Sequence, residues 1–414
     1  MTVGAMMQAR EVEAPLEVEP PLTPRDSFTR LGILVAVLAV IGFLDWGWLA
    51  FIFVLLVSVV LHELGHFLLA RKGGMRASEF FVGFGPRIWS FKRGETEYGI
   101  KAILAGGYVK TPGMTNLEDD IPPELESRTF RAQSYGRRAR MILAGPFTNL
   151  LLALVSFIAL FAFYNEKVFK DTGTPQVTVS TAGPASTAGL RTTDQIVAVD
   201  GQAFPTIESM VAYIKSKPGA TVALSIVRDG APQVVDVTLA SSNPTTGETV
   251  GFLGVAFQGV ESQIARNPVQ AVGRGFGELG YETKETVLGI GRIFSPSGIV
   301  KLWDTVTGQR KDDPTQRASS VVGIGKESST VFRTGFENSL YLFGALNLAL
   351  GLFNLLPIIP FDGGHFVIAT YERLRSRRNK PYRVDFAKVV PFFAPLMAVV
   401  AFVVLSSFLL DIRR

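Results

Sequence analysis

The residues with the clearest chemical potential form the motif His62-Glu63-Leu64-Gly65-His66. Residues four apart lie on one face of a helix, so the two imidazoles could bind a single metal ion. Zinc is the expected metal, because imidazole and carboxylate ligands with one open position are its usual catalytic arrangement. Glu63 would act as the catalytic base, taking a proton from water activated by the metal and passing it to the leaving amine.

The surroundings of this motif favour a metal site over a chance match. In a helix of a soluble protein, the same pattern is as often a solvated face. Here it lies within the apolar run 49–70, where a carboxylate and two polar rings are costly unless they have a function. Two of the three histidines of the chain fall in the motif. A buried His-Glu cluster without metal is the remaining alternative.

A third protein ligand is expected, because catalytic zinc usually has three. Asp362 is the best candidate, because Pro357, Pro360 and the glycines after it should break the helix there and turn the carboxylate inward. His62 lies about 12 Å from the nearer end of its apolar run, and Asp362 lies near the same end of a later run. An Asp-Gly turn without metal and His365 as the ligand are the alternatives. Asn354 could donate a hydrogen bond to an oxyanion or tie two helices together.

Composition agrees with a membrane protein. Apolar residues make up 47% of the 414 residues and lie in a few long runs, whereas the net charge of +5 is scattered and forms no nucleic-acid stripe. The absence of cysteine excludes disulfides, thiolate ligands and a cysteine nucleophile.

Basic loops predict which ends of the membrane-spanning segments face the cytoplasm. We expect a disordered N-terminus (1–27), an extra span that the sequence leaves open (28–47), core spans at 48–71, 139–164, 338–371 and 386–410, and cytoplasmic segments at 72–138 and 372–385.

The stretch between the second and third core spans should lie outside the cytoplasm. Its first part, residues 165–258, contains short runs rich in β-branched residues, with Asp-Gly turns at 200–201 and 229–230. These predict a small β domain with one helix at 206–215. The second part, residues 259–337, predicts an amphipathic helix near 271–293 and is otherwise not placed by its pattern.

The combination of motifs resembles the bacterial branch of the site-2 proteases, which are intramembrane zinc metalloproteases. The resemblance covers most of residues 48–410 and is closest in look to actinobacterial members with one outer domain. It rests on His62-Glu63-Leu64-Gly65-His66, on Asn354-x-x-Pro357-x-x-x-x-Asp362-Gly363, and on the segments 83–110 and 143–149.

This resemblance implies a role for each candidate residue. His62, His66 and Asp362 would be the zinc ligands, Glu63 the base, and Asn354 an assisting group. Residues 83–113 would form a re-entrant β-structure that presents the substrate as an extended strand. The implied fold is a polytopic α-helical membrane protein with four core transmembrane helices, this β-structure and one extracytoplasmic β domain.

The outer domain resembles a PDZ domain through residues 183–190 and 194–201, although Thr193 stands where the PDZ pattern has a Gly-Asp pair. Such a domain would gate or bind substrate peptides. The implied activity is peptide-bond hydrolysis in single-span proteins of the bacterial inner membrane, such as anti-sigma factors, or clearance of signal-peptide remnants. The partners are then membrane-protein substrates and lipid, without nucleic acid. A non-catalytic PDZ scaffold and a metal transporter are rival interpretations, but neither needs a base at Glu63.

Overall fold

The computed structural model describes residues 23–114, 121–164, 166–170, 174–180, 183–244, 248–258, 260–264, 266–312, 317–377 and 380–413. The chain divides into two compact units. One comprises Met1–Leu160 with Gly273–Arg414, here called the helical unit, and the other comprises Phe161–Val272, here called the sheet unit. Most of the N-terminal stretch that we predicted to be disordered lies outside the described residues.

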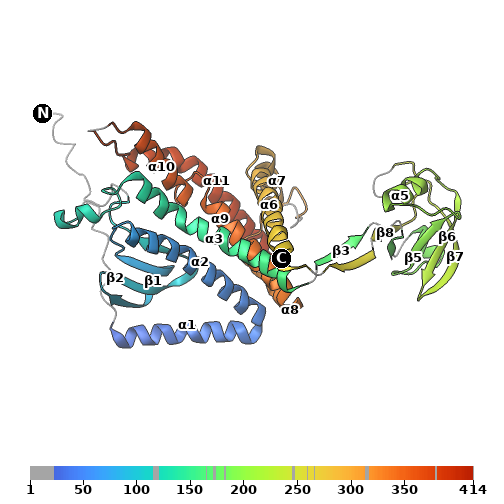
Figure 1. The fold of residues 1–414 in the computed structure, drawn as a ribbon, viewed down its shortest axis with the longest axis horizontal. Helices are drawn as coiled ribbons and strands as arrows, with labels where there is room; N and C mark the ends of the chain where they lie inside the picture. Colours follow the sequence, from blue (N-terminus) through green and yellow to red (C-terminus); the bar gives the residue numbers. More distant parts are fainter. Residues whose placement is uncertain are drawn as a thin grey trace. The chain divides into compact units, whose positions relative to one another are not determined.

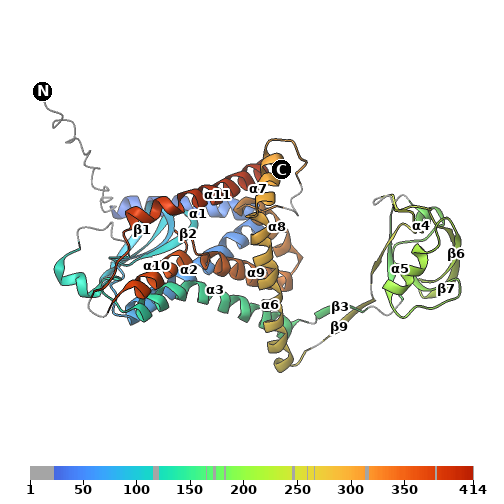
Figure 2. The same ribbon diagram turned by 90° about the horizontal axis from the view of Figure 1, so that it is seen from above.

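Four helices of the described residues are long and apolar enough to cross a membrane. They are α1 (Pro24–Leu44), α2 (Trp46–Lys72), α3 (Tyr135–Phe163) and α11 (Phe386–Arg413), and Figures 1 and 2 show them within the helical unit. The N-terminal helix begins at Pro24 and not at residue 28, because the Thr23 side chain accepts a hydrogen bond from Asp26 N–H and caps it. The run left open by the sequence is therefore helical and long enough to span.

The third predicted core span is two helices and not one. α9 (Phe336–Asn354) ends before the proline-rich segment, and α10 (Asp362–Arg375) begins after it. A Cβ on Gly363 would lie 2.2 Å from the carbonyl oxygen of Leu355, so only glycine lets the start of α10 approach the end of α9 this closely. α9 is not among the four helices above. The predicted break is present, and the helix after it continues past residue 371.

A long β-hairpin follows α2. Its strands β1 (Glu79–Arg93) and β2 (Thr96–Lys110) pair antiparallel with an irregular register. Gly83 has a positive φ of 90°, and a Cβ there would lie 2.8 Å from Ile103 O, so the bend requires glycine. Figure 1 shows the hairpin beside α1 and α2, and an Arg30 guanidinium in α1 donates to Arg87 O at 2.8 Å. A 3₁₀ helix, η2 (Pro123–Arg128), follows within the segment before α3.

Within the described residues, three helices come directly before α9 in the helical unit. They are α6 (Pro268–Ile293), most of which lies in this unit, α7 (Pro296–Val306) and α8 (Val321–Thr334). Of these, α8 packs against α2, while α7 and α8 pack against α11. A Cβ on Gly47 would lie 2.4 Å from Ser329 O, which shows how closely α8 approaches α2. The Arg317 guanidinium bonds the buried Asp411 carboxylate at 2.7 Å. The predicted amphipathic helix is α6, whereas α8 was not predicted.

The sheet unit has its own apolar core. Five antiparallel strands lie in the order β7 (Ala231–Thr238), β6 (Thr221–Arg228), β5 (Gln195–Val199), β4 (Gln176–Val179) and β8 (Val255–Gln258). The core contains fully buried side chains such as Ile196, Met210 and Leu224. The Asp229-Gly230 pair has φ values of 50° and 80°, as a tight hairpin turn requires. A two-stranded ribbon of β3 (Glu166–Lys170) and β9 (Val260–Ile264) accompanies the sheet. The remaining elements are α4 (Pro184–Thr187) and α5 (Ile207–Lys215).

Candidate metal centre

Three predicted ligands meet inside the helical unit. His62 and His66 lie one turn apart on α2, and Asp362 is the first residue of α10. The two Nε2 atoms are 3.1 Å apart, and the Asp362 Oδ2 atom lies 3.2 Å from the first and 3.3 Å from the second. Both histidines are buried. Three ligand atoms thus form a nearly equilateral triangle.

This triangle has the dimensions of a zinc site. Ligand atoms at about 2.0–2.1 Å from one tetrahedral zinc ion lie about 3.3–3.4 Å apart, close to the three distances observed. Oδ2 of Asp362 is buried and makes no hydrogen bond in the part of the chain that the structure describes, as expected of an atom that faces a cation. Two imidazoles and one carboxylate are also a usual donor set for catalytic zinc. The residues therefore fit the ion.

A hydrogen bond to the backbone of α3 fixes the orientation of the His66 ring. Its Nδ1 lies 2.8 Å from the carbonyl oxygen of Met141 in α3. A carbonyl can only accept, so Nδ1 carries the hydrogen and Nε2 keeps its lone pair for a ligand. The first turns of α3 thereby hold one ligand of the cluster.

Glycines bring α3 against the metal face of α2. A Cβ on Gly145 would lie 2.3 Å from His66 Nε2 and 2.6 Å from His62 Nε2. A Cβ on Gly65 would lie 2.7 Å from Thr148 Oγ1. Small residues at helix crossings permit such close approach in membranes. Any larger residue at Gly145 would occupy the space between the two imidazoles.

Glu63 lies between the cluster and the hairpin. Its side chain is buried. A Cβ on Gly107 would lie 2.9 Å from Glu63 Cγ. Strand β2 therefore runs directly past the predicted base.

The family assignment follows from comparison with known proteins. The model of the Peptidase family M50 matches residues 50–400. The chain belongs to this peptidase family. Zinc metalloprotease Rip1 of Mycolicibacterium smegmatis is 33% identical over 388 residues, which cover 86% of this chain and 94% of that protein. Rip1 of Mycobacterium tuberculosis H37Rv is 32% identical, with 87% and 96% covered. RasP of Geobacillus kaustophilus is 28% identical, with 82% and 93% covered.

The peptidase is thus a zinc metalloendopeptidase and a membrane protein, and the resemblance to site-2 proteases is confirmed. Among solved structures, the PDZ domain of the SdrC-like protein Lmo2051 from Listeria monocytogenes is 22% identical and covers 22% of this chain and 92% of that domain, with a TM-score of 0.19. The PDZ domain of Lin2157 from Listeria innocua is 24% identical, covers 20% and 92%, and has a TM-score of 0.18.

The other predicted residues, Asn354 and His365, are not part of the ligand group found among the described residues. Asn354 is the half-buried last residue of α9, and no described hydrogen bond ties it to the three ligands. His365 points to Phe386, with 6.2 Å between ring centroids, and is not in the ligand group.

Sequence reasoning missed a second asparagine. Asn347 in α9 is fully buried and donates to Ser58 Oγ in α2 at 3.0 Å, one turn before His62. Asn347 lies within an apolar run, and a polar residue in such a run is the signal that would have identified it.

Proposed function

We propose that this peptidase hydrolyses peptide bonds in or at the edge of membrane-spanning segments of other proteins. The observation that carries this proposal is the burial of His62, Glu63 and His66 on α2, a helix long and apolar enough to cross a membrane. His62 lies ten residues before the end of α2 at Lys72, or about 15 Å along its axis. The cluster would therefore lie within the hydrocarbon depth of the bilayer.

In this proposal, His62, His66 and Asp362 hold the ion. Bound zinc supplies Lewis acidity, which makes water nucleophilic at neutral pH. Glu63 takes the proton from water and returns it to the leaving amine, since its carboxylate adjoins the first ligand. The buried wall formed by α2, α3 and α10 excludes bulk water from the reaction. Asn354 would assist from the end of α9 by donating a hydrogen bond to the developing oxyanion.

The hairpin of β1 and β2 would position the substrate. β2 passes Glu63 at Gly107, and a peptide added alongside as a further strand would present its main chain to the cluster. Main-chain hydrogen bonds are independent of side-chain identity, so varied sequences could be accepted. A substrate helix must unwind first, because its amides are already bonded within the helix. We propose that the hairpin re-enters the membrane to this end.

The sheet unit would act outside the cytoplasm as a PDZ domain that gates access. Basic residues gather near the hairpin end of α2, at the start of α3 and after α10, which the positive-inside rule assigns to the cytoplasm of the inner membrane. The sheet unit, which follows the opposite end of α3 in the sequence, would then lie on the other side. It would exclude substrates with large outer domains until another protease trims them.

The biological substrates would be single-span proteins whose cleavage releases a cytoplasmic regulator, with anti-sigma factors as the leading class. Clearance of signal-peptide remnants is a second duty of the same site. Both need only a helix that unwinds near its cytoplasmic end.

The test is cleavage of a single-span reporter by the purified peptidase in lipid vesicles, with both product termini identified by mass spectrometry. Wild type should cut within the span or at its edge, and Asp362→Asn should leave the reporter whole. Cuts confined to loops far from the membrane would overturn the proposal. A zinc flux into vesicles without cleavage would favour transport, and a phenotype unchanged by Glu63→Gln would favour a scaffold.

A further inference from the structure

A cavity of about 170 Å³ lies against α10 in the helical unit. Most of its wall is apolar and comes from α10, the start of α11 and the segment before α3. An engineered cavity of about 150 Å³ lined by Leu, Ile and Phe binds benzene, so this cavity has room for a phenyl ring or a branched aliphatic group. The apolar lining includes Met114, Phe130, Ile368, Ala369, Val384 and Phe386.

The cavity begins close to the metal cluster. His365 lines it and lies three residues after Asp362 on the same helix, or about 4.5 Å along the axis. Residues three apart share a helix face, so His365 in the cavity wall and the third proposed ligand lie on the same face of α10. In an extended strand each residue advances about 3.3 Å, so a side chain one or two positions from the scissile bond could reach the cavity.

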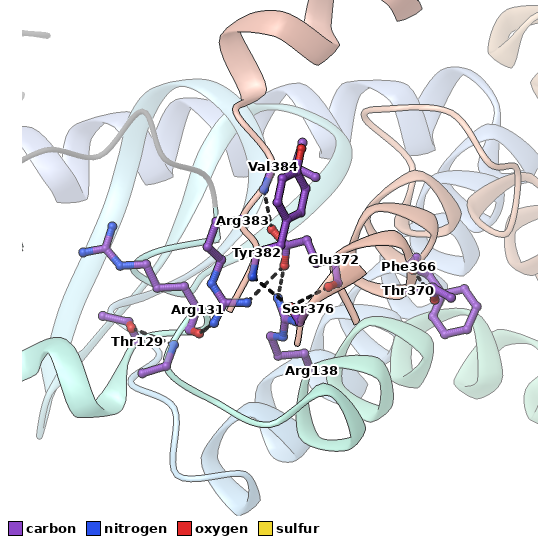
Figure 3. A network of polar contacts seen from close by, with 11 residues as sticks. Thr129, Arg131, Arg138, Phe366, Thr370, Glu372, Ser376, Tyr382, Arg383 and Val384 are labelled. Atoms are coloured by element: carbon purple, nitrogen blue, oxygen red, sulfur yellow. Dashed lines mark hydrogen bonds and ion pairs between the residues drawn. The ribbon is translucent and has the colours of Figure 1, made fainter. Parts of the chain in front are cut away.

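The walls of the cavity are held by a buried polar network, shown in Figure 3. The Glu372 carboxylate accepts hydrogen bonds from Arg138 Nη1 at 2.5 Å, from Val384 N–H at 2.9 Å and from Arg383 Nη1 at 3.3 Å. The side chains of Glu372 and Arg138 are only 6% and 5% exposed. Arg383 also donates to the carbonyl oxygen of Arg131. The segment between α10 and α11 is therefore tied to α10 and to the residues before α3, and the cavity is a built feature of the fold.

One donor in this network remains available. Arg138 Nε is buried and has no hydrogen-bond partner among the residues that the structure describes. Its guanidinium also lies 5.5 Å from the centre of the Phe130 ring, at the boundary between the apolar wall and the polar end. A bound segment with an apolar side chain in the cavity could satisfy this donor with a main-chain carbonyl oxygen.

We propose that this cavity is the substrate side-chain pocket of the peptidase and that it selects a large apolar residue, Leu or Phe, beside the scissile bond. This inference rests on the proposed function and adds the substrate feature that the site recognises. Pairing of the substrate main chain with β2 provides affinity that does not depend on sequence, and the pocket determines which peptide bond is cut.

The experiment uses the full-length peptidase with a panel of single-span reporters. Each reporter carries Ala, Val, Leu or Phe at one position on either side of the cleavage site. Wild type should prefer Leu or Phe over Ala at one position by at least about tenfold in kcat/KM, because an apolar pocket discriminates by contact area. Ile368→Trp fills the cavity and should abolish or reverse the preference at that position alone. Val367→Trp, on the neighbouring exposed position of α10, is the matched control and should keep the wild-type preference.

Val384→Ala provides the opposite change. It enlarges the cavity and should move the preference toward Phe or Trp. If Ile368→Trp fails to fold, judged by zinc content, the result with Val384→Ala decides. The inference is overturned if the reporters are cleaved but no position changes its preference in either cavity variant. A wild-type enzyme that cleaves none of the reporters would instead count against the proposed function.

Discussion

The ligand cluster and the five-stranded sheet of the sheet unit differ in how far apart in the sequence their contacting residues lie. His62 and Asp362 are 300 residues apart (362 − 62) and meet because α10 returns to α2. β6 and β7 are consecutive strands joined by a two-residue turn, with Arg228 paired to Ala231. The cluster depends on the spacing between helices, whereas the sheet depends on local turns and a packed core. Changes in the first should alter chemistry while the protein stays folded, and changes in the second should unfold the sheet unit while metal binding survives.

Glu63→Gln should give the largest effect. Removing the base while keeping the shape of the side chain should lower the cleavage rate by about 10²–10⁴-fold, because general acid–base catalysis contributes on this scale. Zinc content and hydrogen exchange of the sheet unit should stay as in wild type. A variant that loses its zinc would show that Glu63 is needed for the structure of the site. It would contradict the expectation that changes in the cluster alter the chemistry alone.

Ile196→Ala tests the apolar core of the sheet unit. Ile196 is fully buried in the sheet core, so the free energy of unfolding of the sheet unit should fall by about 2–5 kcal/mol. Hydrogen exchange of β5 and β6 in the full-length protein would measure the loss. Val234→Ala at an exposed position of β7 is the control and should change little. Loss of zinc in Ile196→Ala would show that the two units are not independent.

Gly145→Ala sharpens the account of the cluster. The added Cβ would lie between the two imidazoles, so zinc affinity should fall by about 10–100-fold, as for other changes next to metal ligands. Competition with a chelator would measure the affinity. Gly136→Ala is the matched control on the same helix, because a Cβ there meets no atom within 4 Å. Equal affinities in the two variants would contradict the close approach of α3.

Of the effects predicted here, the effect of pH on the stability of the sheet unit should be the smallest. Burial raises the pKa of Asp194, but hydrogen bonds from Arg228 and from Arg191 N–H outweigh it and hold the pKa below its usual range. A lowered pKa in the folded state stabilises the fold above the unfolded value of about 4 and loses this contribution as the pH falls through the folded value. The protection factors of the β5 amides, which remove the intrinsic pH dependence of exchange, should therefore fall below pH 4 in wild type. Asp194→Asn should show a weaker dependence on pH, and an identical pH profile would contradict the role of the pair.

The sequence was sufficient to predict which three side chains meet in the candidate site. The i, i+4 rule placed both histidines on one face of α2, and the helix-breaking residues before Asp362 predicted the turn that brings its carboxylate inward. The strands and the helix of the sheet unit followed from alternation and Asp-Gly turns, because their determinants are local.

Other features could not be predicted because they arise from contacts between distant segments. Arg138 and Glu372 are separated by 234 residues, and nothing in either local sequence indicates the partner. α8 buries mainly glycine and serine residues, and it is held by glycine contacts with α2 that only packing reveals. The course of β2 past Glu63 likewise depends on an irregular register that short-range patterns do not encode.

The most direct test of the central claim is the zinc content of the purified protein and its variants. Wild type and His365→Ala should each hold one zinc ion per chain, whereas His66→Ala and Asp362→Asn should hold almost none. If Asp362→Asn retained the full amount while His365→Ala lost it, the carboxylate would not be the third ligand, and the proposed site would be contradicted.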